Sequence, residues 1–411
     1  MQRVVIVGGG FAGVAAARAL GRRAEVTLVS EDNSLLFTPM LAEVAAADLD
    51  PRHILAPLRH LCPDARIVIG TAVEVSPADR SVRVRSPLGG AERTYTADAL
   101  VVATGSRSAT FGVPGVVEHA LPFRQIGDAL RIRRRLVSLL EESTERPDPA
   151  LTRVVVVGAG YSGAELSAAL ADFLERSRRH YYRTAPPPRV TLVDAVDRVV
   201  PMLPAAASVK AAAALRERGV HLVLGRKVAA VRAGALDLDD GTTLQAASII
   251  WAGGVEALPL PGLDQERGRR GALTVDGHMR VTDGVFALGD AALVPDGHGG
   301  VCPPTAQHAL RQGAHLGRIL PDLLDGRIAP RFRYRTLGEL VSLGHRNAIG
   351  RVLGITVSGF VAWFLWRSYY LLRLPTLVRK ARVAFDWTLD LIFPPDIADP
   401  ASSDLGPDLD A

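Results

Sequence analysis

The sequence predicts an α/β fold with two parallel sheets, because one pattern occurs twice in its 411 residues. VVIVGGGFAG at 4–13 and VVVVGAGYSG at 154–163 each place an apolar run before a glycine-rich turn and an alanine-rich stretch. An all-apolar, β-branched run is typical of a strand buried on both faces of a parallel sheet. A further strand follows each helix, at 25–30 and 189–194, and this completes two Rossmann-like βαβ units.

The composition is that of a folded globular protein. Hydrophobic residues make up 48% and charged residues 22% of the chain, enough for a sizeable core. The formal net charge of +5 is spread along the chain and does not indicate nucleic-acid binding. Cys62 and Cys302 lie far apart without a CxxC motif, so we expect no metal site and a reducing, cytoplasmic setting. The N-terminus runs directly into a strand, so we expect no signal peptide.

The first glycine-rich turn has the spacing of a dinucleotide-binding fingerprint. Gly8 permits the tight turn, Gly10 lets the backbone approach a pyrophosphate, and Gly13 allows close packing of helix on strand. The pyrophosphate would lie at the helix N-terminus, where unpaired N–H groups favour an anion. Phe11 and Ala12 begin that helix, and we assign them to the same cofactor site.

A carboxylate normally ends the second strand of such a unit and accepts the ribose hydroxyls. The strand at 25–30 ends in Ser30, and the first acid after it is Glu31. We therefore predict Glu31 as the ribose ligand, with a solvated turn residue as the alternative.

The second glycine-rich turn contains Gly158, Gly160 and Gly163, and the strand that follows its helix ends in Asp194. This carboxylate can accept both hydroxyls of an adenosine ribose and would repel a 2′-phosphate. The sequence therefore predicts NADH rather than NADPH, although Arg198 lies close enough to soften the preference.

Three residues at the start of the second helix are assigned to the cofactor site, namely Tyr161, Ser162 and Glu165. Glu165 lies on the first turn, where we expect it near the nicotinamide carboxamide. The alternative is a carboxylate that the helix dipole alone favours.

Two later strands end in turns that suit a flavin. ALVVATGS at 99–106 and VFALGDAA at 285–292 are buried strands, and the aspartate after the second can bond a ribityl hydroxyl. The helix at 305–320 would point its N-terminus at the flavin ring and stabilise negative charge on the reduced flavin. These features predict FAD in the first unit. The turn residues assigned to it are Ala103, Thr104, Gly105, Gly289 and Asp290.

The C-terminal segment has the pattern of a membrane-associating helical segment. Residues 352–366 form an uncharged run, shorter than the ~20 residues that a spanning helix needs. Residues 376–393 are amphipathic and basic. We expect an interfacial anchor on an anionic membrane surface, with a dimerisation or domain-covering helix pair as the alternative. The aromatics assigned to the interface are Trp363, Trp366, Tyr369 and Tyr370.

With these motifs in place, the chain resembles the flavoproteins with two dinucleotide-binding domains. Within them it is most similar to the type II NADH dehydrogenases, which are membrane-bound NADH:quinone oxidoreductases. The resemblance covers residues 1 to about 395. The segments that bear it are LLFTPML at 35–41, ATG at 103–105, GAGYSGAELSAAL at 158–170, WAGGV at 251–255, FALGD at 286–290, PTAQHALRQG at 304–313 and SGFVAWFLW at 358–366.

The resemblance implies roles for several residues. It places Gln307 near the isoalloxazine and the quinone, and Gln312 in the same pocket. It places Glu165 at the nicotinamide end, where it counts with the two glutamines as a catalytic candidate. The remaining cofactor contacts that we assign are Thr38, Pro39, Val73 and Ala306 for FAD, and Gly253 and Gly254 for NADH.

Disulfide reductases of the same superfamily carry a redox cysteine pair after the ribose strand, where this chain has FTPMLAEVA without cysteine. Sulfide:quinone oxidoreductases also need well-placed cysteines. Cys302 stands before the flavin-facing helix, but a small buried thiol is the simpler interpretation.

The predicted domain organisation is an FAD domain with an inserted NADH domain and a C-terminal anchor. The ranges are 1–115 for the first part of the FAD domain, 116–280 for the NADH-binding domain, 281–330 for the second part of the FAD domain, 331–395 for the membrane-anchoring segment and 396–411 for a disordered tail.

We expect an enzyme that passes hydride from NADH to flavin and then two electrons to a membrane quinone, menaquinone or ubiquinone, without proton pumping. We expect it to lie peripherally on the cytoplasmic face of the cell membrane. The family resemblance also implies a homodimer. The alternatives are a soluble NADH:ferredoxin-type reductase, a sulfide:quinone-like oxidoreductase and a redox sensor that binds NADH as a ligand.

Overall fold

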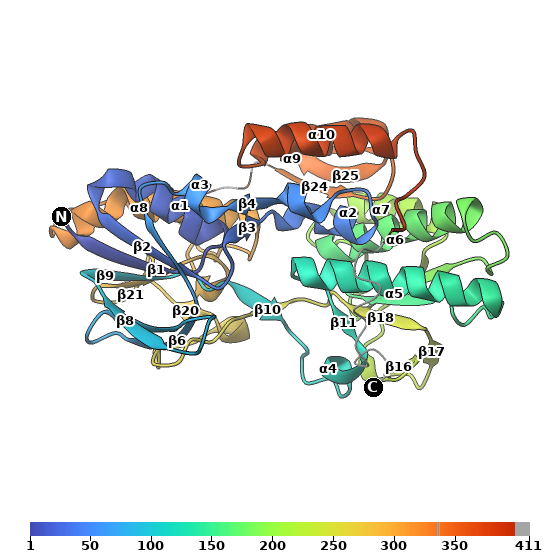
Figure 1. Cartoon of the computed structure of the whole chain (residues 1–411), viewed down its shortest axis with the longest axis horizontal. Helices are drawn as coiled ribbons and strands as arrows, with labels where there is room; N and C mark the ends of the chain where they lie inside the picture. Colours follow the sequence, from blue (N-terminus) through green and yellow to red (C-terminus); the bar gives the residue numbers. More distant parts are fainter. Residues whose placement is uncertain (335, 337, 399–411) are drawn as a thin grey trace. The chain divides into compact units, whose positions relative to one another are not determined.

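The computed structural model describes residues 1–334, 336 and 338–398. They form two compact units, and the chain passes back and forth between them (Figure 1). Each unit is built on a mainly parallel sheet, so the predicted α/β class with two Rossmann-like units is confirmed. The first unit comprises residues 1–37, 55–107 and 255–336, and the second comprises residues 38–54, 108–254 and those after 336.

The boundaries of these units differ from the predicted domain boundaries. The sequence assigned 116–280 to one domain, but the chain returns to the first unit at residue 255. The reason is strand pairing, because β20 (Leu273–Thr274) runs parallel to β23 (Ala292–Leu293) of that unit. The predicted anchor, 331–395, belongs to the second unit from residue 338 onward. Of the predicted disordered tail, 396–411, residues 399–411 lie outside the described part of the chain.

The central sheet of the first unit has six strands in the order β21-β22-β9-β1-β2-β5. The pairs from β22 to β5 are parallel, and only the edge pair of β21 with β22 is antiparallel. The middle strands are apolar on both faces and are buried, as the sequence pattern requires. Their bounds are β1 (Arg3–Val7), β2 (Glu25–Ser30), β5 (Arg66–Ile69), β9 (Ala99–Val102), β21 (Arg280–Thr282) and β22 (Val285–Ala287).

Two helices of the first unit, α1 (Phe11–Leu20) and α8 (Ala306–Leu324), pack against each other at close range. Small residues permit the approach. A Cβ added to Gly313 would overlap the carbonyl oxygen of Ala12, and one added to Gly317 would lie 2.5 Å from that of Ala16. The N-terminus of α8 is thereby fixed relative to that of α1.

Smaller elements complete the first unit. An antiparallel sheet contains β6 (Thr71–Ser76), β7 (Ser81–Arg85) and β8 (Glu92–Thr96), and a hairpin pairs β3 (Ser34–Leu36) with β4 (Leu55–Pro57). The chain crosses between the units near β10 (Ser106–Ser108) and β19 (Val255–Ala257). The short helices are η1 (Gly21–Arg23), α3 (Leu58–Leu61), η4 (Arg269–Gly271) and η5 (Gly289–Ala291).

The second unit has a five-stranded parallel sheet in the order β11-β18-β12-β13-β14 and a three-stranded antiparallel sheet, β15-β16-β17. The parallel strands are β11 (Leu121–Pro122), β12 (Arg153–Val157), β13 (Arg189–Asp194), β14 (His221–Leu224) and β18 (Ser248–Trp251). The other strands are β15 (Val228–Arg232), β16 (Ala235–Leu238) and β17 (Thr243–Gln245). The helices are η2 (Thr38–Met40), α2 (Leu41–Ala45), η3 (Pro51–Ile54), α4 (Val116–His119), α5 (Ile126–Glu145), α6 (Tyr161–His180) and α7 (Ala205–Glu217).

The C-terminal part of the second unit begins with a sheet that the sequence did not predict. β24 (Gly338–Ser342), β25 (Ala348–Val352) and β26 (Ile355–Ser358) form an antiparallel meander. Two helices follow, α9 (Gly359–Arg373) and α10 (Leu377–Asp390), and they lie beside each other in Figure 1. Thr376 caps α10 by accepting the N–H of Arg379 at 3.2 Å.

The aromatic residues of these helices lie differently from the prediction. Trp366 is 1% exposed and Trp363 is 7% exposed, so both are core residues rather than interface residues. The exposed face of α9 instead presents Phe360, Val361 and Phe364. The helical phase explains the difference, because positions 362, 363 and 366 all turn inward once α9 begins at Gly359. Among the described residues, no helix is long and apolar enough to cross a membrane.

We predict that Gly313→Ala lowers the free energy of unfolding by about 1–3 kcal/mol, because the new Cβ would force α1 and α8 apart. Chemical denaturation of the full chain measures this. Gly127→Ala in α5 is the matched control, because its new Cβ would meet no atom within 4 Å. This substitution should not destabilise the protein, since alanine has a higher helix propensity than glycine. A Gly313→Ala protein as stable as the wild type would contradict the described packing.

Candidate functional site

The first fingerprint turn connects β1 to α1 and is shaped by its glycines. Gly8 has φ +119°, and a Cβ there would overlap the carbonyl oxygen of Ala103. A Cβ on Gly13 would overlap the carbonyl oxygen of Gly8. Gly10 differs, because a Cβ there would meet no protein atom within 4 Å. The fold therefore requires two of the glycines, and the third leaves open space at the N-terminus of α1, where an anion would bind.

The end of β2 holds the two candidates for the ribose contact. Ser30 is buried, and a Cβ on Gly9 would overlap its hydroxyl oxygen. Glu31 follows directly and is exposed to solvent. The carboxylate at this end of the sheet is thus free to turn toward a ligand, while Ser30 is held under the glycine turn.

The turn after β22 is held by two hydrogen bonds. The Ser106 hydroxyl donates to Asp290 at 2.6 Å, and the Gly289 N–H donates to the side-chain oxygen of Gln312 at 2.8 Å. Gln312 is 2% exposed. Its described contact is with the turn, so Gln312 positions Gly289 and Asp290 from within the unit rather than lining an open pocket.

The start of α8 carries Ala306, Gln307 and His308. The Tyr334 hydroxyl lies 3.3 Å from the side-chain oxygen of Gln307. His308 is buried, its ring lies 2.7 Å from the Thr305 hydroxyl, and burial lowers its pKa. The sequence analysis missed His308 and Tyr334, although the first lies inside the AQHALRQ motif that it singled out.

The other residues assigned to FAD divide between the two units. Ala103, Thr104 and Gly105 follow β9, and Gly105 has φ +76°. Val73 lies on β6 of the same unit. Thr38 and Pro39 form η2, which belongs to the second unit.

The second fingerprint repeats the geometry of the first. Gly158 has φ +108°, with the carbonyl oxygen of Ala252 2.5 Å from its would-be Cβ, and a Cβ on Gly163 would overlap the carbonyl oxygen of Gly158. Gly160 alone faces open space. Gly253 and Gly254 follow β18 at the same edge of the sheet, and Gly254 has φ +138°.

Asp194 closes this edge of the sheet. It accepts the N–H of Ala159 in the glycine turn and the N–H of Val196 at 2.8 Å. Each carboxylate oxygen keeps further acceptor capacity for a ribose hydroxyl. Arg198 donates to the carbonyl of Pro201 at 2.6 Å, which directs part of its guanidinium away from this carboxylate.

α6 begins with Tyr161 and Ser162, and Glu165 follows just beyond its first turn. Ser162 is exposed. The Tyr161 hydroxyl donates to Glu339 of β24, and burial together with this carboxylate raises its pKa. Glu165 accepts the N–H of Ser342 at 3.0 Å, and its removal from water raises its pKa to about 8.

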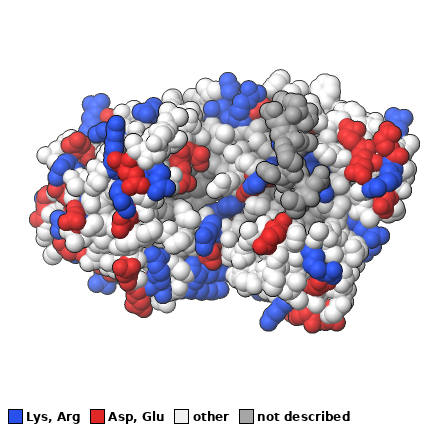
Figure 2. Space-filling view, turned by 60° about the horizontal axis from the view of Figure 1, so that its bottom comes forward, with Lys and Arg blue, Asp and Glu red and all other residues white. Residues whose placement is uncertain are grey.

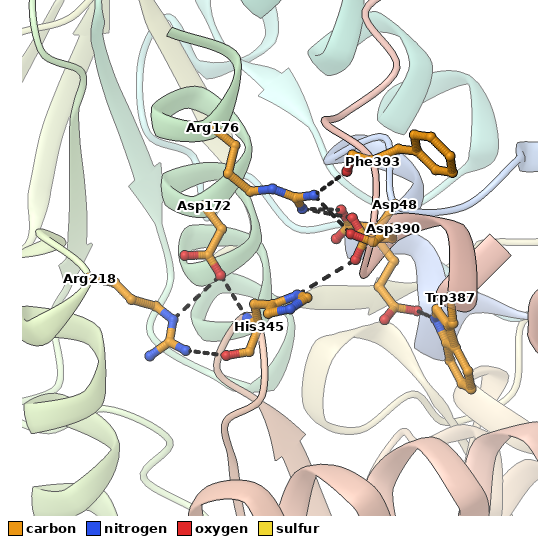
Figure 3. A network of polar contacts seen from close by, with 9 residues as sticks. Asp48, Asp172, Arg176, Arg218, His345, Trp387, Asp390 and Phe393 are labelled. Atoms are coloured by element: carbon orange, nitrogen blue, oxygen red, sulfur yellow. Dashed lines mark hydrogen bonds and ion pairs between the residues drawn. The ribbon is translucent and has the colours of Figure 1, made fainter. Parts of the chain in front are cut away.

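Charged side chains from several elements of the second unit form a network of polar contacts (Figure 3). Most of them line a cavity that Glu165 also lines. Arg176 of α6 pairs with Asp390 of α10 at 2.7 Å and lies 3.7 Å from Asp48. Asp172 accepts the N–H of His345 at 2.7 Å and lies 3.5 Å from Arg218. Arg176 thus joins α6 to α10 within this network.

Charged side chains of both signs are interspersed over much of the face drawn in Figure 2. Among the described residues, no group of His, Cys, Asp or Glu is arranged to hold a metal ion.

Residues 2–313 match the pyridine nucleotide-disulphide oxidoreductase family. The chain belongs to this family.

Curated relatives extend the likeness over nearly the whole chain. The type II NADH:quinone oxidoreductase Ndh of Mycobacterium tuberculosis is 30% identical, covering 95% of this chain and 88% of the relative. The demethylphylloquinone reductase NdbB of Synechocystis is 30% identical, with 94% and 95% covered. A probable NADH dehydrogenase of Dictyostelium discoideum is 29% identical, with 97% and 91% covered. The predicted resemblance to type II NADH dehydrogenases is confirmed.

Solved structures with low sequence identity share the fold of this chain. NDH2 from Plasmodium falciparum in complex with NADH has a TM-score of 0.87 at 17% identity, covering 97% of this chain and 100% of that one. The sulfide:quinone oxidoreductase of Aquifex aeolicus has a TM-score of 0.71 at 18% identity, with 96% of each chain covered.

The two cysteines of this pyridine nucleotide-disulphide oxidoreductase do not form a redox pair. Cys62 and Cys302 are both free and buried. Burial raises the pKa of Cys62 to about 11 and also raises that of Cys302. A reactive thiol needs the opposite shift, because the thiolate is the nucleophile. The cysteines therefore behave as small core residues.

We predict that Arg176→Ala lowers the free energy of unfolding by roughly 3–5 kcal/mol, because it leaves the carboxylate of Asp390 without its cation. The Asp390 side chain is only 6% exposed. Arg179→Ala, on the same helix and 70% exposed, should cost about 0–1 kcal/mol. Urea denaturation of both variants measures the difference. Equal losses of stability in the two variants would show that the Arg176–Asp390 ion pair does not stabilise the packing of the C-terminal helices.

Proposed function

We propose that the chain is an NADH:quinone oxidoreductase that holds FAD in its first unit and binds NADH in its second. The observation that carries the proposal is the pair of central fingerprint glycines. Gly10 and Gly160 face open space, whereas their neighbours in each turn are packed against backbone. Only an approaching ligand gives a reason for glycine at these two positions. Relatives that cover most of the chain are named as NADH:quinone oxidoreductases.

The residues of the first unit fit an FAD. The N-terminus of α1 would hold the pyrophosphate, Glu31 the ribose, and Asp290 a ribityl hydroxyl. FAD, when bound, supplies hydride acceptance and electron transfer. The chain supplies orientation, because Gln312 and Ser106 fix the Gly289–Asp290 turn.

The residues of the second unit fit NADH. The turn around Gly160 would hold the pyrophosphate, and Asp194 would accept the adenosine ribose hydroxyls. Glu165, just beyond the first turn of α6, would lie at the nicotinamide end. The overall reaction is NADH + H⁺ + quinone → NAD⁺ + quinol, with menaquinone or ubiquinone as the acceptor and without proton pumping.

The exposed face of the C-terminal helices suits a membrane surface. It carries large apolar side chains together with Arg373, Lys380 and Arg382. Apolar side chains beside cations favour the interface of an anionic bilayer. We propose peripheral binding at the cytoplasmic face, where the quinone enters from the membrane. The exposed apolar residues include Phe360, Val361, Phe364, Leu372, Leu377, Val378 and Phe385.

The alternatives explain fewer of these observations. A sulfide:quinone-like reaction lacks a suitable thiol, because both cysteines are buried with raised pKa values. A soluble ferredoxin-type reductase or an NADH sensor gives no reason for the apolar face of α9 and α10.

The test compares acceptors in steady-state NADH oxidation by the full chain, with menaquinone, ubiquinone, ferredoxin and sulfide as partners. We expect fast turnover with a quinone. Gly10→Ala should lose bound flavin, and Gly160→Ala should keep flavin but bind NADH roughly 10- to 100-fold more weakly, which corresponds to about 1–3 kcal/mol of steric overlap.

Each variant is the control for the other, because both add one methyl group in open space. A wild-type protein that oxidises NADH with none of the quinones would sink the proposal. The proposal would also be wrong if the Gly160→Ala protein lost its flavin while the Gly10→Ala protein retained it.

The membrane face is tested with Phe364→Glu combined with Leu372→Glu. Both side chains are well exposed, at 59% and 72%, so the fold should be retained. Binding to anionic vesicles should fall at least about tenfold, since each buried apolar side chain contributes about 1.5–3 kcal/mol. Val209→Glu on α7, 70% exposed, is the control. Unchanged cosedimentation of the double variant would rule out this face.

A further inference from the structure

The second unit contains a partly open cavity of about 30 Å³, and Glu165 is one of the residues that line it. A buried water molecule needs a cavity of roughly 10–15 Å³. The cavity therefore has room for about two water molecules. The lining residues come from several separate segments, among them α2, α6, α9 and α10. Glu43 and Glu165 are half-buried, as expected for side chains that face such a space.

The charges around the cavity do not balance. Two arginines line it and a third pairs with Asp172, against five carboxyl groups. Even if the imidazole of His345, which lines the cavity 3.6 Å from Asp390, is counted as a fourth cation, five ionised carboxyls would leave a negative charge without a partner. Unpaired charge removed from water is strongly unfavourable. Protonation relieves the imbalance. The carboxyl groups are Glu43, Asp48, Glu165, Asp172 and Asp390, and the arginines are Arg176, Arg218 and Arg367.

The surroundings of each carboxyl favour protonation of some and ionisation of others. Asp390 lies against Arg176 and His345, and these partners bring its pKa below the usual value despite its burial. Glu43 accepts the indole N–H of Trp387 at 3.2 Å, and removal from water raises its pKa to about 7. The same cause raises the pKa of Asp48 well above its usual value, and Asp390 and Glu43 add to the shift.

The surroundings of the acids are fixed by aromatic side chains. The Arg367 guanidinium lies 4.2 Å from the Trp363 ring centre and 4.6 Å from that of Trp387, so it is held between two rings. Its charge opposes the rise in the pKa of Glu43. The other titratable or charged groups near the cavity are Tyr161, Glu339, His345, Arg346, Tyr370, and Asp386 with its partner His53.

Three polar atoms of residues that line the cavity have no hydrogen-bond partner among the described residues. One is the indole nitrogen of Trp366, a residue 1% exposed. The Trp366 indole is close enough to Glu165 to lower the pKa of that carboxyl, but its N–H does not meet the distance and angle of a hydrogen bond. The other two atoms are Nε of Arg367 and Oδ2 of Asp390, and this oxygen lies 3.6 Å from Nδ1 of His345, beyond hydrogen-bond distance. Buried polar groups in this state indicate bound water, for which the cavity has room.

We infer that this cavity is a proton-loading site, in which Glu43 and Asp48 share a proton with bound water and pass it to Glu165. The inference rests on the proposed function. NADH gives up two electrons and one proton as hydride, whereas quinone takes two electrons and two protons. The second proton passes from the cavity through Glu165 to the reduced quinone, and a proton from the solvent replaces it in the cavity.

The experiment uses the flavin-loaded full chain with Glu43→Gln, and with Glu175→Gln as the matched control. Glu175 lies on α6 and pairs with Arg178 and Arg179. NADH oxidation is measured against pH with a quinone, and with ferricyanide, which takes electrons but no proton. Infrared spectra at neutral pH record the carbonyl band of protonated carboxyl groups.

We expect quinone reduction by the wild type to fall as the pH rises through about 7, where Glu43 loses its proton. Glu43→Gln should reduce quinone about tenfold more slowly, lose this pH dependence and keep its ferricyanide rate. Its infrared carboxyl band should weaken. Glu175→Gln should match the wild type in all measurements.

Three results would overturn the inference. They are a Glu43→Gln protein with the quinone rate and pH profile of the wild type, equal losses with quinone and ferricyanide, and a wild-type spectrum without a protonated carboxyl at neutral pH. Asp48→Asn carries the same expectations if Glu43→Gln does not fold. A wild type that reduces no quinone defeats the proposed function instead, and the two failures are thus distinguishable.

Discussion

The ion pair between Arg176 and Asp390 ties the end of the described chain to the nucleotide-binding fold of the second unit. Arg176 also donates to the carbonyls of Asp390 and Phe393, at 3.0 Å and 2.9 Å, so its guanidinium closes the C-terminus of α10 (Figure 3). Once α10 is fixed there, Trp387 lies over Glu43 and the inner face of α9 is covered. These two helices form one side of the cavity beside Glu165, and residues of α2 and α6, among others, line the rest of it.

The two C-terminal helices therefore have two faces with different chemistry. The inner face supplies Trp366, Arg367 and Asp390 to the cavity, and the outer face is apolar with basic residues at its edge. A helix pair that only attached the protein to a membrane would need no buried arginine between tryptophan rings. Removing the pair would open the cavity as well as delete the apolar face, so substitutions on the outer face separate the two roles.

Local sequence patterns were enough to predict the two βαβ units, because a glycine turn between a buried strand and a helix is specified by adjacent residues. The cavity could not be predicted in this way. Glu43, Asp48 and Asp390 come from distant segments, and Glu43 lies in a run that reads as an apolar helix. The tryptophans of α9 were misassigned because aromatic residues serve both cores and interfaces. The strands β24, β25 and β26 were missed, since short strands with glycine give a weak pattern.

The central claim is that electrons pass from NADH through bound flavin to a quinone. An anaerobic stopped-flow measurement on the vesicle-bound full chain tests this most directly, with flavin absorbance and quinol followed together. We predict that NADH bleaches the flavin and that quinone in the vesicle restores its absorbance, with quinol formed in the amount of NADH consumed. Flavin that is reduced by NADH but stays reduced in the presence of quinone would contradict the account.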